Sequence, residues 1–154
     1  MAIIIYRIGD ESMLDEIRPL WEALNRHHHQ SSENFKTYFE KNSFETRRMY
    51  LLKKAQNGQL RIEIAVDRET SRNVGVCISR IEFSGNAEIE SIYVLEKYRG
   101  LGLGQKLFRN AIDWMDEKGV HTKTVSVAAG NEQALTFYER FGFYPKRIQL
   151  EQRK

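Results

Sequence analysis

The chain of 154 residues contains little of what marks several protein classes. Its single cysteine, Cys77, excludes an internal disulfide and a zinc site built from several cysteines. No apolar run approaches the roughly 20 residues of a membrane span, so we expect a soluble chain without a membrane partner. Two prolines and no low-complexity tract leave nothing that resembles an interdomain linker. We therefore expect residues 1–154 to form a single domain.

An excess of charge of one sign is also lacking. The chain has 24 Lys and Arg residues against 21 Asp and Glu residues, a net charge of +3, and the two signs are interspersed. A dedicated nucleic-acid-binding domain usually carries a contiguous basic surface, so we expect no nucleic-acid partner. The first ten residues, MAIIIYRIGD, lack the basic segment and cleavage site of a signal peptide, which favours a cytoplasmic location.

The first 58 residues predict one strand followed by helices. Apolar residues recur at helical spacing from about residue 10 to 24 and again from 35 to 52, and Pro19 should kink or split the first helix. Three histidines, His27, His28 and His29, fall near the end of that helix. Consecutive helical residues point in three directions, so the spacing argues against a metal site, and a polar helix end beside a pocket is the expected alternative; their role stays open.

The remaining residues predict a mixed sheet with helices packed on it, an α/β architecture. LRIEIAVD and VGVCISRIEF form an expected antiparallel hairpin, and AEIESIYV is the next strand. A helix should then end at Gly119, followed by the strand TKTVSVAA. The segment NEQALTFYERFG predicts a helix capped by Asn131 and ended by Gly142, and FYPKRIQLE predicts a final strand.

Three glycines, Gly100, Gly102 and Gly104, stand between a predicted strand and a predicted helix. A glycine inside a helix costs about 1 kcal/mol relative to alanine, so the cluster indicates that the backbone contacts a ligand. Dinucleotide-binding and Walker motifs do not fit, because Gln105 and Leu107 stand where glycine is needed and Gly-Lys is absent. The alternatives are an anion site made by the loop amides and Arg99, or a tight turn without a ligand.

The glycine segment resembles that of the GNAT superfamily of N-acetyltransferases, in which Arg or Gln is followed by two residues, Gly, one residue, and Gly or Ala. Arg99, Gly102 and Gly104 match it. The resemblance continues in IESIYVLEKYRG and NEQALTFYERFGF and covers residues 60 to 145. It implies a GNAT-like fold with a central, mostly antiparallel sheet, a splayed strand pair and helices on both faces. Residues 1–58 would form variable acceptor-side helices and residues 60–150 the cofactor-binding core.

The resemblance implies that acetyl-CoA is bound and that its acetyl group passes directly to a primary amine in a ternary complex, without a metal. Its pyrophosphate would lie on the amides of residues 99 to 104. Its pantetheine arm would follow an open strand edge, whose amides could also stabilise an oxyanion. The implied cofactor-binding residues are Ile92, Tyr93, Val94, Arg99, Gly100, Leu101, Gly102, Leu103, Gly104, Asn131 and Tyr138.

Two side chains are candidate catalysts. An alkylammonium group must lose a proton before it attacks, and Glu90 is the candidate base. Strand alternation predicts that Glu88, Glu90, Ile92 and Val94 share one face, where apolar neighbours would raise the pKa of the Glu90 carboxyl. Pairing of Glu90 with a basic residue on a covering helix, or a water relay, are the alternatives. The resemblance makes Tyr138 the acid that protonates the departing thiolate, although its helical spacing alone predicts core packing.

The acceptor is the part of the reaction that the sequence leaves unspecified. A small-molecule amine and a peptide amine both fit. A non-catalytic sensor or regulatory module that binds acetyl-CoA or CoA is the alternative function, because the glycine segment alone does not require turnover. Members of the resembled family often dimerise, which leaves a homodimer open.

Overall fold

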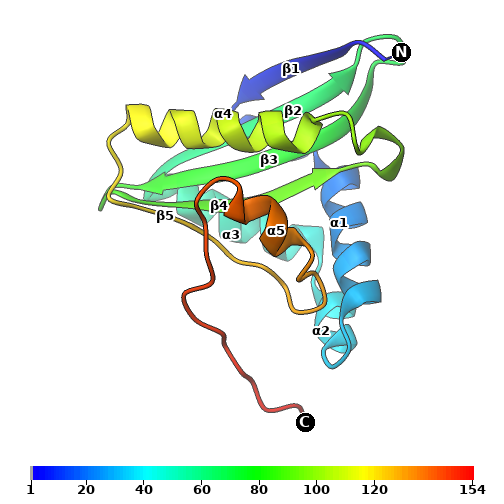
Figure 1. The fold of residues 1–154 in the computed structure, drawn as a ribbon, viewed down its shortest axis with the longest axis vertical. Helices are drawn as coiled ribbons and strands as arrows, with labels where there is room; N and C mark the ends of the chain where they lie inside the picture. Colours follow the sequence, from blue (N-terminus) through cyan, green and yellow to red (C-terminus); the bar gives the residue numbers. More distant parts are fainter. Residues whose placement is uncertain (1) are drawn as a thin grey trace.

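The computed structural model describes residues 2–154 and is built around one sheet. The strands are β1 (Ile4–Gly9), β2 (Gly58–Asp67), β3 (Arg72–Glu82), β4 (Asn86–Val94) and β5 (Thr122–Val125). They lie side by side in chain order (Figure 1). Neighbours pair antiparallel except β4 and β5, which pair in parallel. The predicted mixed, mostly antiparallel sheet is therefore confirmed.

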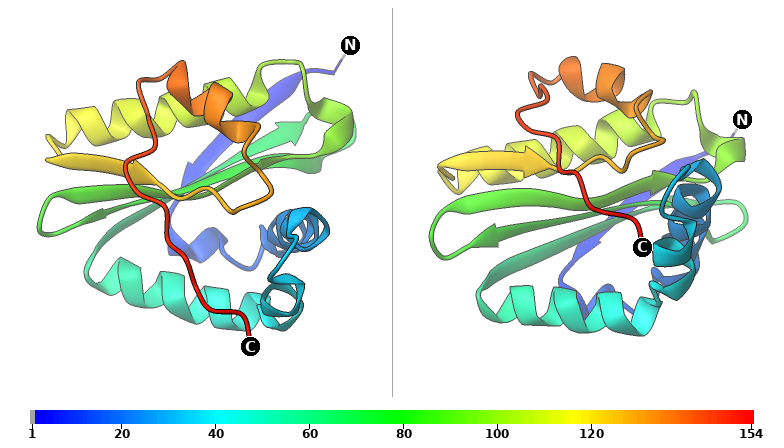
Figure 2. Two further views of the ribbon diagram at one scale, coloured as in Figure 1. Left: turned by 60° about the horizontal axis from the view of Figure 1, so that its bottom comes forward. Right: turned by 90° about the horizontal axis from the view of Figure 1, so that it is seen from below.

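Helices cover both faces of the sheet, as predicted. The helices are α1 (Arg18–Ser31), α2 (Lys36–Lys41), α3 (Phe44–Gln56), α4 (Leu103–Glu117) and α5 (Ala134–Glu139), with short 3₁₀ turns η1 (Glu11–Met13) and η2 (Glu96–Tyr98). α4 and α5 lie on one face, and α1, α2 and α3 lie on the other (Figure 2). Within residues 2–154, none of these helices has the length and apolar character that spanning a bilayer requires.

Proline and serine divide the amino-terminal helices. The predicted helix from residue 10 is split into η1 and α1, and Pro19 lies in the first turn of α1, where its missing N–H would have no intrahelical partner anyway. The helical pattern from residue 35 to 52 is also broken in two. Ser43 caps α3, because its hydroxyl accepts a hydrogen bond of 3.2 Å from the Thr46 amide.

The carboxyl-terminal third differs from the prediction at three places. The strand predicted over residues 122–129 ends at Val125, and the strand predicted over 143–151 does not form. Tyr144, Ile148 and Leu150 are exposed there, and no described strand pairs with this segment even though β5 is an edge strand of the sheet. Asn131 is not the cap of α5, because a turn precedes that helix and Gln133 is its first flanking residue.

A bulge in β4 changes which residues share a face. Ile78 of β3 lies opposite Ser91, whereas its neighbour Ser79 lies opposite Ile89, so Glu90 is an extra residue in the ladder. The predicted face shared by Glu88, Glu90, Ile92 and Val94 is therefore wrong. Ile92 and Val94 pack toward α4, while Glu90 contacts α3. A period of two holds only where no residue is inserted.

Apolar cores fill both sides of the sheet. One core lies under α1 and α3, and the other lies under α4 and α5 and includes the buried thiol of Cys77. Phe108 of α4 is fully buried at the centre of the second core. Its ring centroid lies between 4.7 and 5.6 Å from those of four aromatic residues that follow β5: Phe137, Tyr138, Phe141 and Phe143.

Replacing Phe108 with alanine should lower the free energy of unfolding by about 3–5 kcal/mol, because four aromatic rings lose their common partner and a cavity remains. Urea denaturation followed by circular dichroism measures the change. Phe83→Ala is the matched control, since Phe83 is 80% exposed and its loss should change stability by less than about 0.5 kcal/mol. Equal effects of the two substitutions would contradict this packing.

Candidate functional site

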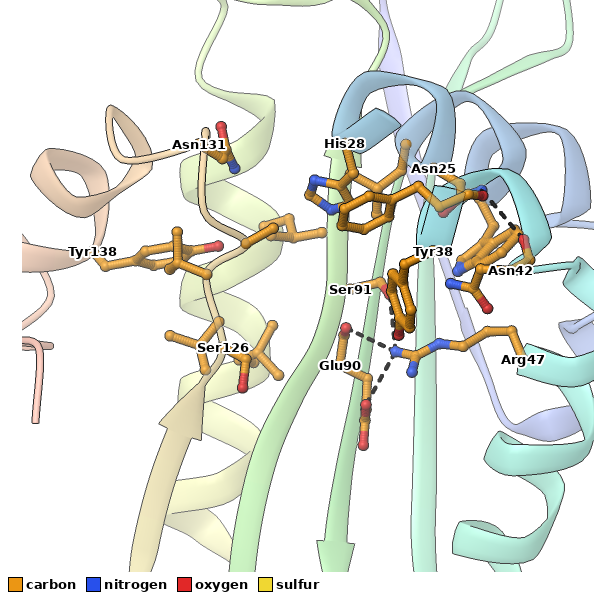
Figure 3. A pocket seen from close by; sticks show the side chains of 18 of the residues that line it. Asn25, His28, Tyr38, Asn42, Arg47, Glu90, Ser91, Ser126, Asn131 and Tyr138 are labelled. Atoms are coloured by element: carbon orange, nitrogen blue, oxygen red, sulfur yellow. Dashed lines mark hydrogen bonds and ion pairs between the residues drawn. The ribbon is translucent and has the colours of Figure 1, made fainter. Parts of the chain in front are cut away.

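The site begins where β4 and β5 separate. Their parallel pairing covers only Asn86–Ile89 of β4 and Thr122–Val125 of β5. Beyond Ile89, β4 continues along β3 as far as Val94, and no described strand pairs with its other edge. The predicted splayed pair is therefore confirmed, and Figure 3 shows the side chains of Tyr138 and Ser126 beside the opening.

Two cavities meet at this opening. One, of about 460 Å³, lies beside α1 and α2, and the other, of about 660 Å³, lies beside the glycine segment. Ile92, Asn131 and Tyr138 line both cavities. A group held at these three residues is therefore accessible to ligands from both sides, and we call this place the junction.

The second cavity gathers most of the predicted cofactor residues. Ten of the eleven line it: Ile92, Tyr93, Val94, Arg99, Gly100, Gly102, Leu103, Gly104, Asn131 and Tyr138. Leu101 does not line it, and its side chain is 58% exposed. The sequence reasoning missed five further lining residues: Tyr98, Gln105, Ala134, Phe137 and Arg140. Helical spacing of Ala134, Phe137 and Arg140 could have indicated them, because they lie on the same helical segment as Tyr138.

The glycines of the segment differ in what they do. Gly100 and Gly102 have φ values of +81° and +83°, a left-handed conformation that other residues rarely adopt. Gly104 lies in the first turn of α4, where a Cβ atom would meet only Val94 Cγ2 at an ordinary 3.9 Å. The packing of the protein therefore does not require glycine at position 104. Its missing side chain leaves backbone exposed at the cavity wall.

The start of α4 presents donors to the second cavity. The first amides of a helix have no intrahelical partner, and among residues 2–154 no group accepts a hydrogen bond from the amides of Leu103, Gly104 and Gln105. Arg99 donates a 2.9 Å hydrogen bond from Nε to the Val94 carbonyl, which ties the segment to β4. Arg140 lies over the Phe137 ring at the same cavity. Helix amides and two guanidinium groups together suit an anion.

Tyr138 brings a protonated hydroxyl to the junction. Tyr138 is 8% exposed, and the centroid of its ring lies 5.4 Å from that of the Phe108 ring in the second core. Figure 3 shows its hydroxyl directed toward the gap between β4 and β5. Burial, with a smaller contribution from Cys77, raises the pKa of Tyr138 to about 12. The hydroxyl is therefore a hydrogen-bond donor at neutral pH.

Glu90 lies in a different environment from the one predicted. Its Oε1 atom is 3.0 Å from Arg47 Nη2, and its Oε2 atom accepts a 3.0 Å hydrogen bond from the Tyr50 hydroxyl and another from Arg80 Nε. The Glu90 side chain is 2% exposed. The prediction of apolar neighbours for Glu90 is therefore wrong. The alternative prediction, pairing with a basic residue on a covering helix, agrees with the contact between Glu90 and Arg47 of α3. A role for Glu90 as base stays a prediction.

The histidine run is divided between the first cavity and the surface. His28 lines the first cavity, and burial followed by the neighbouring His27 lowers the pKa of its ring. Its Nδ1 atom is buried without a partner among the described residues. His29 Nε2 lies 3.1 Å from Glu40. Within residues 2–154, no three His, Cys, Asp or Glu side chains group closely enough to hold a metal ion.

A close backbone contact borders this region. Gly130, in the loop after β5, has a φ of +98°, and a Cβ atom built there would lie 2.1 Å from the carbonyl oxygen of Ser31. Ser31 is the last residue of α1. The loop therefore passes directly against the carboxyl end of α1, next to the junction residue Asn131.

Comparisons with known proteins place the chain among acetyltransferases. Residues 15–143 match the profile described as the acetyltransferase (GNAT) family. Phosphinothricin N-acetyltransferase of Streptomyces coelicolor is 26% identical over 84% of this chain and 77% of its own length. Three further curated relatives match over less than half of their own length.

Solved structures share the fold over almost the whole chain. A putative acetyl transferase from Pyrococcus furiosus superposes with a TM-score of 0.68 at 26% identity, covering 96% of this chain and 99% of that one. An aminoglycoside N-acetyltransferase in complex with CoA gives a TM-score of 0.69 at 17% identity, with coverage of 100% and 96%. At 17% identity, the likeness to this second structure shows a shared fold alone.

The pKa of Tyr138 should be about 12 instead of the ordinary tyrosine value of 10.0, because burial disfavours the phenolate. Ultraviolet titration of phenolate absorbance, with the curve of Tyr138→Phe subtracted, isolates this group. Since an unfolded tyrosine ionises first, the free energy of unfolding should also fall as the pH rises from 10.0 to about 12. Ionisation of Tyr138 near pH 10.0 would contradict its buried position.

Proposed function

The chain belongs to the acetyltransferase (GNAT) family, and from this premise we propose that it transfers the acetyl group of acetyl-CoA to a primary amine by direct attack in a ternary complex. The observation that carries the proposal is the junction of the two cavities at Ile92, Asn131 and Tyr138. A thioester reaching the junction through one cavity is met by an amine from the other. The enzyme then needs no covalent intermediate.

The second cavity is the proposed site of acetyl-CoA. Its pyrophosphate accepts hydrogen bonds from the amides at the start of α4, with Arg140 adding positive charge. The two amide groups of its pantetheine arm pair with the open edge of β4 near Tyr93 and Val94, much as another strand would. That an aminoglycoside N-acetyltransferase of the same fold was solved in complex with CoA supports CoA as the ligand class.

The reaction joins nitrogen to the acetyl carbon and breaks the carbon–sulfur bond. The amine gives up one proton through water before attack and passes a second to the departing sulfur after it, and the negative charge that develops on the carbonyl oxygen faces the β4 amides around Ile92. The Tyr138 hydroxyl donates a hydrogen bond to the departing thiolate. Its pKa of about 12 lies above that of a thiol, near 8.5, so the donated bond stabilises the thiolate while the amine supplies the net proton.

The first cavity is the proposed acceptor site, for a small-molecule or peptide amine. Its walls come from α1, α2 and α3 as well as from β4 and the loop after β5. Residues 1–58 thus contribute to acceptor binding, whereas all residues lining the second cavity fall within 60–150. The alternative, a CoA-binding sensor without turnover, leaves this first cavity without a substrate.

Calorimetric titration with acetyl-CoA should show saturable binding near one molecule per chain, and Gly104→Val should weaken it at least about tenfold because its side chain covers the helix amides. Lys106→Val is the matched control: it places the same β-branched residue in the same turn but outside the second cavity. No binding of acetyl-CoA at millimolar concentration would refute the proposed donor.

Tyr138→Phe should lower kcat by about 10²-fold while leaving the affinity for acetyl-CoA nearly unchanged, because only the hydroxyl at the leaving sulfur is lost. Thiol release during incubation with a panel of primary amines measures the rate. Tyr144→Phe is the control, since Tyr144 is 71% exposed. Full activity of Tyr138→Phe would show that Tyr138 has a packing role only. Binding of acetyl-CoA without thiol release for any amine tested would favour the alternative function, a sensor without turnover.

A further inference from the structure

The bulge in β4 lies directly before the junction and is not held by regular strand pairing. Glu90 has no opposite residue on β3, and the pairing with β5 stops at Ile89. A bulge bends its strand and redirects the residues that follow it. Ser91 and Ile92 rejoin the ladder opposite Ile78 and Cys77, so contacts that hold Glu90 from outside the ladder act at the bend that directs this next stretch of β4.

Arg47 of α3 supplies those contacts. Its Nη2 atom lies 2.9 Å from the carbonyl oxygen of Glu90, 3.0 Å from Glu90 Oε1 and 3.3 Å from Ser91 Oγ, and donates to all three (Figure 3). One guanidinium nitrogen thus contacts both the backbone and the side chain of the bulged residue. The contact joins residues 43 positions apart in the chain.

The Arg47 guanidinium is itself held in place. It lies 4.9 Å from the centroid of the Tyr50 ring, whose hydroxyl donates to the same carboxylate. Arg80 of β3 holds the other oxygen of Glu90 from the strand side. The exposed fractions are 20% for the Arg47 side chain and 2% for Glu90, so water competes little for these charge-assisted bonds.

Arg47 also lines the first cavity, together with Glu90 and Ser91. An acceptor in that cavity lies against the residue that fixes the bulge. The bulge in turn leads into Ile92, which lines both cavities. The acceptor-side helix α3 and the strand edge at the junction are therefore joined through one side chain.

We propose that Arg47 is a positioning residue for acetyl transfer, which fixes the β4 bulge so that the strand edge after Glu90 faces the junction in the orientation required by the reaction. The proposal rests on the proposed function for the identity of the reaction. Arg47 does not exchange protons with the substrates. It acts through the backbone that it holds.

The test compares Arg47→Met and Arg47→Lys with the same substitutions at Arg48. Arg48 is the next residue of α3, is 42% exposed and pairs with Asp15 outside both cavities. Arg47→Met should lower kcat about 10–100-fold, because the strand edge loses its fixed orientation, while the dissociation constant of acetyl-CoA changes less than about threefold. The kcat of Arg47→Lys should lie between those of wild type and Arg47→Met, since an ammonium group keeps the charge but lacks the planar array of donors of a guanidinium group.

If Arg47 contributed only to stability, the result would differ. Its substitution would lower the melting temperature without lowering kcat at temperatures where the variants are folded. Wild-type kcat in folded Arg47→Lys and Arg47→Met would overturn the proposal. If Arg47→Met does not fold, Arg47→Lys decides the question alone.

Hydrogen–deuterium exchange tests the same contact without a substrate. Amides of residues 90–94 should exchange faster in Arg47→Lys than in wild type or Arg48→Lys, whereas the β2 and β3 amides keep their rates. Unchanged exchange in residues 90–94 would overturn the proposal. Failure to bind acetyl-CoA in the wild type would instead refute the proposed function and leave this readout intact.

Discussion

The parting of β4 from β5 after Ile89 is the constraint on which the rest of the structure depends. A central strand with one unpaired edge exposes backbone donors and acceptors inside the protein, where unpaired polar groups are costly. The chain keeps this edge open with α4 and α5 on one face of the sheet and α1 and α3 on the other. Their two apolar cores supply the rigidity that the missing strand pairing does not.

The glycine segment and the α5 region become parts of one site because of that opening. Arg99 ties the end of β4 to the loop before α4, and Phe108 on α4 holds the aromatic rings that carry Tyr138 to the opposite side. Backbone amides that suit an anion and the Tyr138 hydroxyl thus approach the same gap from different segments, through contacts with one helix. The geometry of the gap therefore depends on α4 as much as on the residues that line the cavities.

Local patterns predicted much of this arrangement. The helix that follows the glycines was expected from local patterns, because glycine and apolar spacing act over a few residues, whereas the splayed strand pair was expected from the resemblance to the GNAT family. The apolar neighbours expected for Glu90 were wrong, because one inserted residue turns Ile92 and Val94 to the other face. Its pairing with a basic residue on a covering helix was an alternative, but local spacing did not identify the distant Arg47 as that residue. The segment after Phe143 alternates like a strand but is not paired with the sheet, and local alternation does not determine whether pairing forms.

The contact between Gly130 and Ser31 has a consequence for how the opening could be altered. With only 2.1 Å between the site of an absent Cβ and the Ser31 carbonyl oxygen, any larger residue would act as a spacer between α1 and the loop after β5. Gly130 lines neither cavity. A side chain at position 130 would therefore change the spacing between α1 and this loop while leaving every residue of the cavity walls as it is.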